Sequence, residues 1–377
     1  MKSKLFVFTI GLLLLATLSS GCWDLLEVDK RAFISTLGID GNEEGMIVLS
    51  AQIPLPHKML PPGATSGGEP GKQFSTINFS AESVNTALNG LQAKTYQEVV
   101  IEQTKSIVIN EELARQGIAQ ITENFIRNPK MPPQAVIFFT SNHTAEEILS
   151  FSPVQEILPG FQFIQAAQLV IKGNWTYYTP LWEFEQKLMH KATDPFAPLI
   201  NLDPKDKMFV TAGLAVFNGD RLAGKLDMAE TQYFGLLAGL MQAGSLKIDL
   251  PGNKVLTLRN VRGDSKIKVS ESADGAPFFL IKTEITGTLN EITDTGEELT
   301  PAHIQKLESV AEQVLRPCLI NVIKKLQNFN ADIVGFGDKL RIQHQDRWQR
   351  MEWKNLYPTV PFAIQVKLKI DKDGALR

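Results

Sequence analysis

The first 22 residues constrain this chain most, because they predict the compartment in which the rest of it must fold. Lys2 and Lys4 precede an uncharged, Leu-rich run of fourteen residues from Leu5 to Leu18, and small residues follow that run. A helix that spans a membrane needs roughly 17–25 residues, so this run is too short to be one. A basic start, a short apolar stretch and a small-residue exit are the layout of an export signal. We therefore predict that residues 1–21 are a signal peptide.

Cys22 stands directly after this segment, preceded by Ser19, Ser20 and Gly21. Small residues before a cysteine resemble the bacterial lipoprotein signal, in which cleavage makes the cysteine the first residue and its thiol carries a diacylglyceryl group. Two acyl chains are enough for stable attachment, whereas one chain alone is marginal. We expect Cys22 to anchor the exported chain in the membrane. The alternative is an ordinary signal peptide followed by an unrelated cysteine.

Composition predicts that the exported part is a folded protein of several domains. A chain of 377 residues is long enough for two or three domains, and 44% apolar and 21% charged residues are typical of globular proteins. With Cys318 as the only other cysteine, no disulfide framework is available, and we expect that thiol to be buried in a core. The net charge of −3, without a block of basic residues, argues against nucleic acid as a partner.

Strand and helix patterns alternate in the N-terminal half, which predicts a mixed sheet with helices packed on it. Strand patterns over 32–40 and 45–53 predict a hairpin, and a Pro- and Gly-rich loop follows it. Asn110 begins a helix that we expect to end near Asn128. Thr144 and Glu147 have the spacing of a capping box at the start of another helix.

The C-terminal half contains further strand patterns and the longest helical pattern of the chain. The helix is expected over 304–326, where Pro317 should kink or divide it. The predicted strands are 209–217, 222–226, 254–261, 278–289 and 362–370. The fold class predicted from both halves is α+β or mixed α/β, multidomain, with mixed β-sheets and packed helices behind a lipoprotein signal peptide.

We predict boundaries between the domains from prolines and charges. Pro195, Pro198 and Pro204 lie just before or within a short charged stretch that ends at Lys207. The predicted division is a signal peptide at 1–21, an N-terminal α/β domain at 22–203, a small middle unit at 208–253 and a C-terminal α+β domain at 254–377.

Catalytic and cofactor motifs do not stand out in the sequence. The five histidines lie far apart, and no cysteine cluster accompanies them, so we predict no metal. Gly335-Phe336-Gly337 lacks the third glycine of a dinucleotide-binding turn, and there is no Gly-x-Ser-x-Gly elbow. We therefore expect neither an enzyme nor a cofactor.

Motifs at both ends of the exported part carry a family resemblance. They are Cys22-Trp23-Asp24 with Gly38-Ile39-Asp40, then Phe125-Ile126-Arg127-Asn128, Gly213-Leu214-Ala215-Val216-Phe217 with Leu222 and Gly224, and Asp332-Ile333-Val334-Gly335-Phe336-Gly337 with Trp348 and Trp353. Together they resemble the Ger(x)C family, the lipoprotein C subunits of spore nutrient germinant receptors. The resemblance implies several α/β domains tethered to the spore inner membrane, and a large and a polytopic membrane subunit as partners.

Several motif residues allow both a structural and a functional interpretation. Trp23 and Asp24 follow the anchor, so the ring either sits at the lipid headgroups or packs on the first domain. Gly335 and Gly337 around Phe336 indicate a tight passage of the backbone, with a ligand loop as the alternative. Trp348 and Trp353 are five residues apart, so on one helix they would not share a face. We predict that one of them is core and that the other could anchor a partner.

The function predicted from these observations is that of a lipid-anchored, non-enzymatic receptor subunit that acts in assembly and signalling of spore germination. The competing hypothesis is a lipid-anchored solute-binding protein of a transporter, which needs two similar lobes that close on a ligand. The second half of the sequence shows no repeat of the first. A third class, an envelope hydrolase, would need catalytic groups that the sequence does not display.

Overall fold

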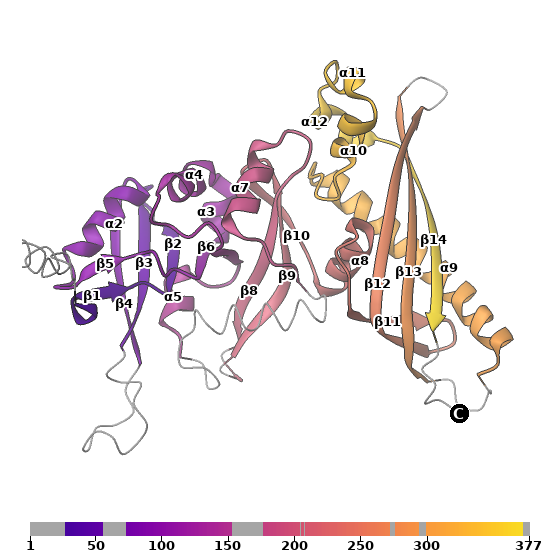
Figure 1. The fold of residues 1–377 in the computed structure, drawn as a ribbon, viewed down its shortest axis with the longest axis horizontal. Helices are drawn as coiled ribbons and strands as arrows, with labels where there is room; N and C mark the ends of the chain where they lie inside the picture. The colour runs from indigo at the N-terminus through magenta and orange to yellow at the C-terminus, as the bar shows by residue number, and fades with distance from the viewer. Residues whose placement is uncertain are drawn as a thin grey trace, which may run out of the picture.

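The computed structural model describes residues 27–55, 73–152, 176–203, 205–206, 208–271, 276–293 and 299–371. These residues form two large sheets with helices packed on them (Figure 1). The fold is of the predicted mixed α+β class. Within these ranges, no helix is both long and apolar enough to cross a bilayer. The predicted signal peptide lies outside the described residues.

The first sheet has eight strands in the order β10-β9-β8-β7-β6-β2-β3-β4. Its central pairs, β2 with β6, β6 with β7 and β7 with β8, are parallel, and the pairs at both ends are antiparallel. The strands are β2 (Thr36–Gly41), β3 (Ile47–Pro54), β4 (Phe74–Ala81), β6 (Ser106–Asn110), β7 (Val136–Thr140), β8 (Phe196–Asp203), β9 (Met208–Asn218) and β10 (Arg221–Leu226). The predicted first hairpin is confirmed as β2 and β3.

Helices cover both faces of this sheet. One face packs on α2 (Val84–Gln92), α3 (Glu111–Gln116), α4 (Ala119–Arg127) and α7 (Leu181–Met189). The other face packs on α5 (Ala145–Ser150), whose predicted capping box between Thr144 and Glu147 is present. A short parallel pair, β1 (Arg31–Phe33) and β5 (Glu98–Val100), and the 3-10 turn η1 (Val28–Lys30) lie at the N-terminal end.

The helix predicted from Asn110 to Asn128 is two helices. Asn110 caps α3 as expected, its side chain accepting the Glu112 N–H, but α3 ends at Gly117 with φ +120°. That backbone conformation is open to glycine and strained for other residues, so the chain turns there before α4 begins. The apolar pattern continued through the break and concealed it.

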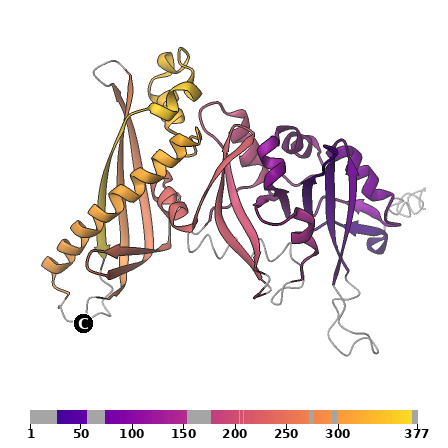
Figure 2. The same ribbon diagram turned by 180° about the vertical axis from the view of Figure 1, so that it is seen from behind.

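The second sheet has four strands in the order β11-β12-β13-β14, with β13 and β14 parallel. The strands are β11 (Gly244–Leu250), β12 (Lys254–Glu271), β13 (Pro277–Ile292) and β14 (Phe362–Asp371). Alternate residues of β11 are buried and exposed, the pattern of a strand with one face on a core. Helix α9 (Pro301–Asn328) lies obliquely across one face of this sheet (Figure 2). Pro317 lies inside α9 without dividing it.

Shorter elements join the two sheets. Helix α8 (Met228–Ala238) connects them, and α10 (Phe336–Gln343), α11 (Gln345–Trp348), α12 (Trp353–Leu356) and the turn η3 (Tyr357–Thr359) lie between α9 and β14. The apolar core between the second sheet and α9 also contains Phe196, Leu214 and Val216 of the first sheet. The two sheets therefore share a continuous apolar core at their junction.

The segment 208–253, predicted as a small middle unit, is divided between the two sheets. Its strands β9 and β10 extend the first sheet, and β11 belongs to the second. Prolines and charges at 204–207 suggested a boundary, but β8 and β9 pair on both sides of this stretch. Asp203 accepts hydrogen bonds from the N–H groups of Lys205 and Asp206, as in an ordinary turn. Cys318, expected in a core, is only half-buried.

Candidate functional site

The predicted lipidation site lies outside the described residues. Cys22, Trp23 and Asp24 precede Glu27, where the description begins. The site that the structure does describe is formed by the C-terminal motif, from Asp332 to Gly337, together with Trp353. It lies at the junction between the two sheets.

The side chain of Asp332 is the centre of this site. Its Oδ1 accepts the N–H groups of Gly335 at 2.8 Å and of Phe336 at 3.0 Å. Its Oδ2 accepts the N–H of Gly337 at 2.7 Å and the indole N–H of Trp353 at 3.1 Å. Four donors thus surround one carboxyl group that is only 1% exposed. Burial raises the pKa of Asp332 to about 7, although the backbone N–H groups of 335–337 act in the opposite direction.

The two glycines of the motif are required by this geometry. Gly335 has φ +88°, in the left-handed region that favours glycine. A Cβ on Gly337 would lie 2.5 Å from the carbonyl oxygen of Ala192 and 2.6 Å from Nε1 of Trp353. The tight backbone passage expected from the sequence is therefore present, and it wraps the N–H groups around the Asp332 carboxylate.

Asp194, which precedes β8, connects this loop to the first sheet. Its Oδ2 accepts the N–H of Asp332 at 2.7 Å, and its own N–H donates to the Asp332 carbonyl at 3.0 Å. Its Oδ1 accepts the N–H of Gly219, in the turn between β9 and β10, and the ammonium of Lys354. Lys354 also donates to Asn218 Oδ1 at 2.7 Å. One polar network thus joins α12, the C-terminal motif and two segments of the first sheet, the residues before β8 and the end of β9 with its turn.

Aromatic side chains enclose the network. The Phe336 ring stacks on Phe279 with centroids 4.9 Å apart, and Trp353 lies 5.9 Å from Phe279. Trp353 is 4% exposed, whereas Trp348 is half-buried, and their ring centroids are 6.1 Å apart. The two tryptophans belong to different short helices, so the single-helix spacing argument does not apply to them. Trp353 is a core residue, and Trp348 lies at the rim.

A cavity of about 550 Å³ opens beside Trp348 and Trp353. Lys187, His190 and Lys191 also line it, as do Asp194 and Lys354. These last two side chains are engaged with each other, so they are not poised as an acid and a base. The cavity instead offers the half-buried Trp348 ring and the exposed Lys191 as contact surface, because Trp353 is buried and Lys187 is paired with Glu183.

Other motif residues have structural roles within the first sheet. Asp40 accepts the N–H groups of Ala145 at 2.7 Å and Glu146 at 3.0 Å, so it caps α5. Burial raises its pKa to about 6, against the effect of these two hydrogen bonds. A Cβ on Gly38 would lie 3.2 Å from that of Ala145, which shows how closely α5 approaches β2.

Gly213 and Gly224 also permit close contacts. Gly213 has φ +101°, and an added Cβ would lie 2.0 Å from the Leu226 carbonyl oxygen. At Gly224 an added Cβ would lie 2.3 Å from the ring of Phe329, the residue after α9. Gly224 therefore lets the end of α9 pack directly against β10, the edge strand of the first sheet.

Sequence reasoning missed Asp194, Asn218 and Lys354. Asp194 and Lys354 are single polar residues without a local pattern, and the pattern at Asn218 indicates only a turn; Asp194 lies 138 positions from its partner Asp332. The available signal was Asp332 itself, an acidic residue within an otherwise apolar and glycine-rich motif. Within the described ranges, no three His, Cys, Asp or Glu side chains form a group that could hold a metal ion.

Two family models together match most of the chain. One, described as "Spore germination protein N-terminal domain", matches residues 24–202. The other, described as "Spore germination B3/GerAC like, C-terminal", matches residues 212–374 and includes the Asp332 loop. The boundary between them lies next to the turn between β8 and β9.

Curated relatives are similar over their full length at low identity. The chain is 24% identical to the putative spore germination protein YfkR of Bacillus subtilis (strain 168), covering 97% of this chain and 96% of that protein. It is 23% identical to spore germination protein GerQC of Bacillus cereus, covering 96% and 97%. The crystal structure of the GerBC protein shares its fold, with a TM-score of 0.56, 19% identity and coverage of 89% of this chain and 96% of that one.

Proposed function

Because this chain belongs to the GerAC-like family of spore germination proteins, we propose that it is the lipid-anchored C subunit of a spore nutrient receptor. In this proposal Cys22 carries a diacylglyceryl group, and the folded part lies on the exported face of the spore inner membrane. Its partners are a large and a polytopic membrane subunit. Its role is in assembly and signalling, without catalysis of its own.

The junction around Asp332 is the observation that best supports a role in signalling. In a subunit that takes part in signalling, a structural change on one sheet must be coupled to the other, which requires a rigid connection between them. Here Asp194, which precedes β8, accepts the N–H of Asp332 and the ammonium of Lys354, and Lys354 also donates to Asn218 of β9, so these hydrogen bonds bridge the sheets. Hydrogen bonds that involve a charged group contribute roughly 1.5–3 kcal/mol each, so relative motion of the sheets would be costly.

The membrane anchor contributes by confinement. A tether converts an encounter in solution into one at high effective concentration, so a modest interface is enough for stable assembly. The surface formed by Lys191 and Trp348 at this cavity is our candidate for such an interface. Tryptophan is among the residues that dominate binding energy at interfaces.

The solute-binding alternative is less well supported. It requires two similar lobes that close on a ligand. The two sheets differ in strand number and order, eight strands of mixed direction against four. Helices cover both faces of the first sheet, whereas α9 lies across the second.

The anchor is tested by acyl labelling in the sporulating organism. Cells that express the full chain are fed a radiolabelled fatty acid, and the protein is recovered from the membrane fraction. The Cys22→Ala variant should lose the label and retain its signal peptide. Cys318→Ala, which removes the only other cysteine, should be labelled as the unaltered chain is.

Germination provides the functional measurement on the same strains. Spores with Cys22→Ala should respond more slowly to nutrients than spores with Cys318→Ala. Full labelling of the Cys22→Ala protein, or a normal nutrient response without the label, would contradict the proposed anchored subunit.

A further inference from the structure

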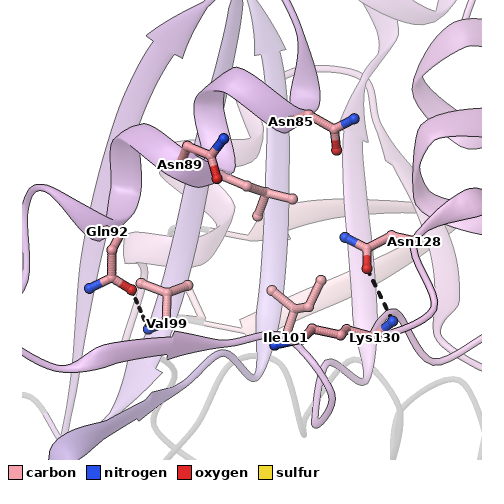
Figure 3. A pocket seen from close by; sticks show the side chains of 8 residues that line it. Asn85, Asn89, Gln92, Val99, Ile101, Asn128 and Lys130 are labelled. Atoms are coloured by element: carbon pink, nitrogen blue, oxygen red, sulfur yellow. Dashed lines mark hydrogen bonds between the residues drawn. The ribbon is translucent and has the colours of Figure 1, made fainter.

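A groove far from the Asp332 site lies beside α2 in the first domain (Figure 3). Its volume is about 360 Å³, which is in the range of ligand-binding pockets. Helix α2 lines one side of the groove, and Val99 of β5, Ile101 and the loop with Asn128 and Lys130 lie across from it (Figure 3). The family motif at 125–128 therefore ends in this groove.

Helix α2 presents a row of amide side chains to the groove. Val84, Ala87 and Leu91 are buried in the core. Asn85, Asn89 and Gln92 are exposed and line the groove, at spacings of four and three residues. Residues at these spacings share one face of a helix. Three amides thus follow one another along the wall, as Figure 3 shows.

The amide of Gln92 already binds a polypeptide backbone. Its Oε1 accepts the N–H of Val99 at 2.8 Å, and its Nε2 donates to the carbonyl of Gln97 at 2.8 Å. Val99 belongs to β5, so this side chain makes the pair of hydrogen bonds that a residue of a neighbouring strand would make. Gln92 shows how this helix face contacts an extended chain.

The other amides retain free hydrogen-bonding groups. Among the described residues, Asn89 makes no hydrogen bond through its side chain, and Asn85 uses only its Nδ2, donating to Asn124 at 3.3 Å. Asn128 accepts the Lys130 N–H at 3.0 Å with Oδ1 and leaves its Nδ2 free. The groove therefore offers both donors and acceptors, the combination that a peptide group requires.

The spacing of the amides fits an extended chain. Four residues of helix rise about 6 Å, which separates Asn85 from Asn89 along the axis. Peptide groups on the same side of a strand repeat every two residues, or about 6.6 Å. The two asparagines can thus contact alternate residues of one extended segment.

The charge and polarity of the residues that line the groove restrict the kind of ligand it can bind. Among the described residues that line the groove, Lys130 is the one with a charged side chain, and its ammonium lies 3.6 Å from Glu102. Leu88, Val99 and Ile101 make the remaining surface apolar. A neutral backbone with small side chains satisfies this lining, whereas a strongly charged ligand does not.

We propose that this groove binds a short extended polypeptide segment of a partner protein, held through its backbone amides by Asn85, Asn89 and Asn128. This groove is separate from the Asp332 junction, and peptide binding in it does not depend on the lipid anchor.

The probe is the pentapeptide acetyl-Ala-Thr-Ala-Thr-Ala-amide, titrated against the full chain in detergent micelles and followed by saturation-transfer NMR. The expected result is saturable binding by this peptide, and none by the same peptide methylated at every backbone nitrogen. D-glucose serves as a neutral hydroxyl-rich probe. The proposal is overturned if glucose saturates the groove and the peptide does not, if neither binds, or if the methylated peptide binds equally well.

Variants locate the binding. Asn85→Ala combined with Asn89→Ala should weaken peptide binding about tenfold, the loss expected from removing two hydrogen bonds. Gln120→Ala, an exposed amide on α4 outside the groove, is the matched control and should leave binding unchanged. Both altered positions of the double variant are exposed, so circular dichroism should match that of the unaltered chain. Equal binding by the double variant and the control would place the peptide elsewhere and refute the proposal.

Discussion

At the scale of single residues, Asp332 makes the largest number of hydrogen bonds in the polar network. It is a buried acid whose oxygens face four N–H donors, with Asp194 and Lys354 nearby. Replacement by Asn keeps one acceptor oxygen but turns an NH₂ group toward N–H donors. A buried group left without a partner costs about 1–3 kcal/mol, so we expect Asp332→Asn to lower the free energy of unfolding by at least that amount.

The pH dependence of that loss is a second prediction. The pKa of Asp332 is raised from 3.8 to about 7 in the folded chain, so the folded state binds the proton more tightly than the unfolded state. The stability that this causes is present at acid pH and is lost as the pH rises through about 7. The difference in pKa between the unfolded and the folded chain corresponds to a loss of on the order of 4 kcal/mol in the free energy of unfolding over this pH range.

Urea unfolding of the unaltered chain and of Asp332→Asn, from about pH 4.5 to 8, measures this dependence. The advantage of the unaltered chain over the variant should shrink as the pH rises. An advantage that grows with pH would mean that the four donors lower the pKa of Asp332, contrary to our expectation.

The residue scale also shows what the sequence could and could not predict of the site. The motif from Asp332 to Gly337 was visible, and its glycines indicated a tight backbone passage. The carboxyl at the start of the motif had no assigned role, because the donors around it become adjacent only after folding. Its link to Asp194 joins positions 138 residues apart, and a single sequence carries no sign of such a pair.

At the scale of elements, β14 illustrates how an edge strand is protected. It lies at the end of the second sheet, where unpaired N–H groups could recruit another chain. Glu312 of α9 accepts the N–H of Leu368 at 2.9 Å, and Glu308 accepts that of Ile370 at 2.8 Å. The helix thus provides acceptors that a neighbouring strand would otherwise supply.

Removal of both acceptors should expose this edge. The Glu308→Ala, Glu312→Ala double variant is expected to lose about 1–3 kcal/mol in free energy of unfolding and to self-associate. The corresponding Gln variant keeps an acceptor oxygen at each position and should remain close to the unaltered chain. Sedimentation velocity and denaturant unfolding measure both effects, and identical behaviour of the Ala and Gln variants would refute the protective role.

Local patterns predicted most elements but not all of them. Strand β8 was missed because prolines at 195 and 198 usually exclude an inner strand. Pro198 is accommodated because the pairing of β8 with β9 shifts register between it and Ile200. Helix α9 continues through Pro317, whereas the chain turns between α3 and α4 at Gly117, which has a positive φ. The outcomes at Pro198, Pro317 and Gly117 depend on tertiary packing and backbone geometry, which local sequence patterns do not show.

At the scale of the whole molecule, the two sheets meet through a shared apolar core and the polar network at Asp332 and Asp194. Shared burial and buried hydrogen bonds both oppose separation of the domains. The predicted domain division at 203 and 208 does not follow the sheets, because β9 and β10 complete the first one. Under the proposed signalling role, a contact made on one sheet would reach the other through these packed elements.

The central claim is that this chain works as one subunit of a membrane complex. The most direct measurement is affinity purification of the full, tagged chain from detergent-solubilised spore membranes, followed by mass spectrometry. We predict recovery of a large and a polytopic membrane subunit in constant proportion to the chain, and their loss when Cys22→Ala is used. Recovery of the unaltered chain without membrane subunits, from spores that respond normally to nutrients, would contradict the account.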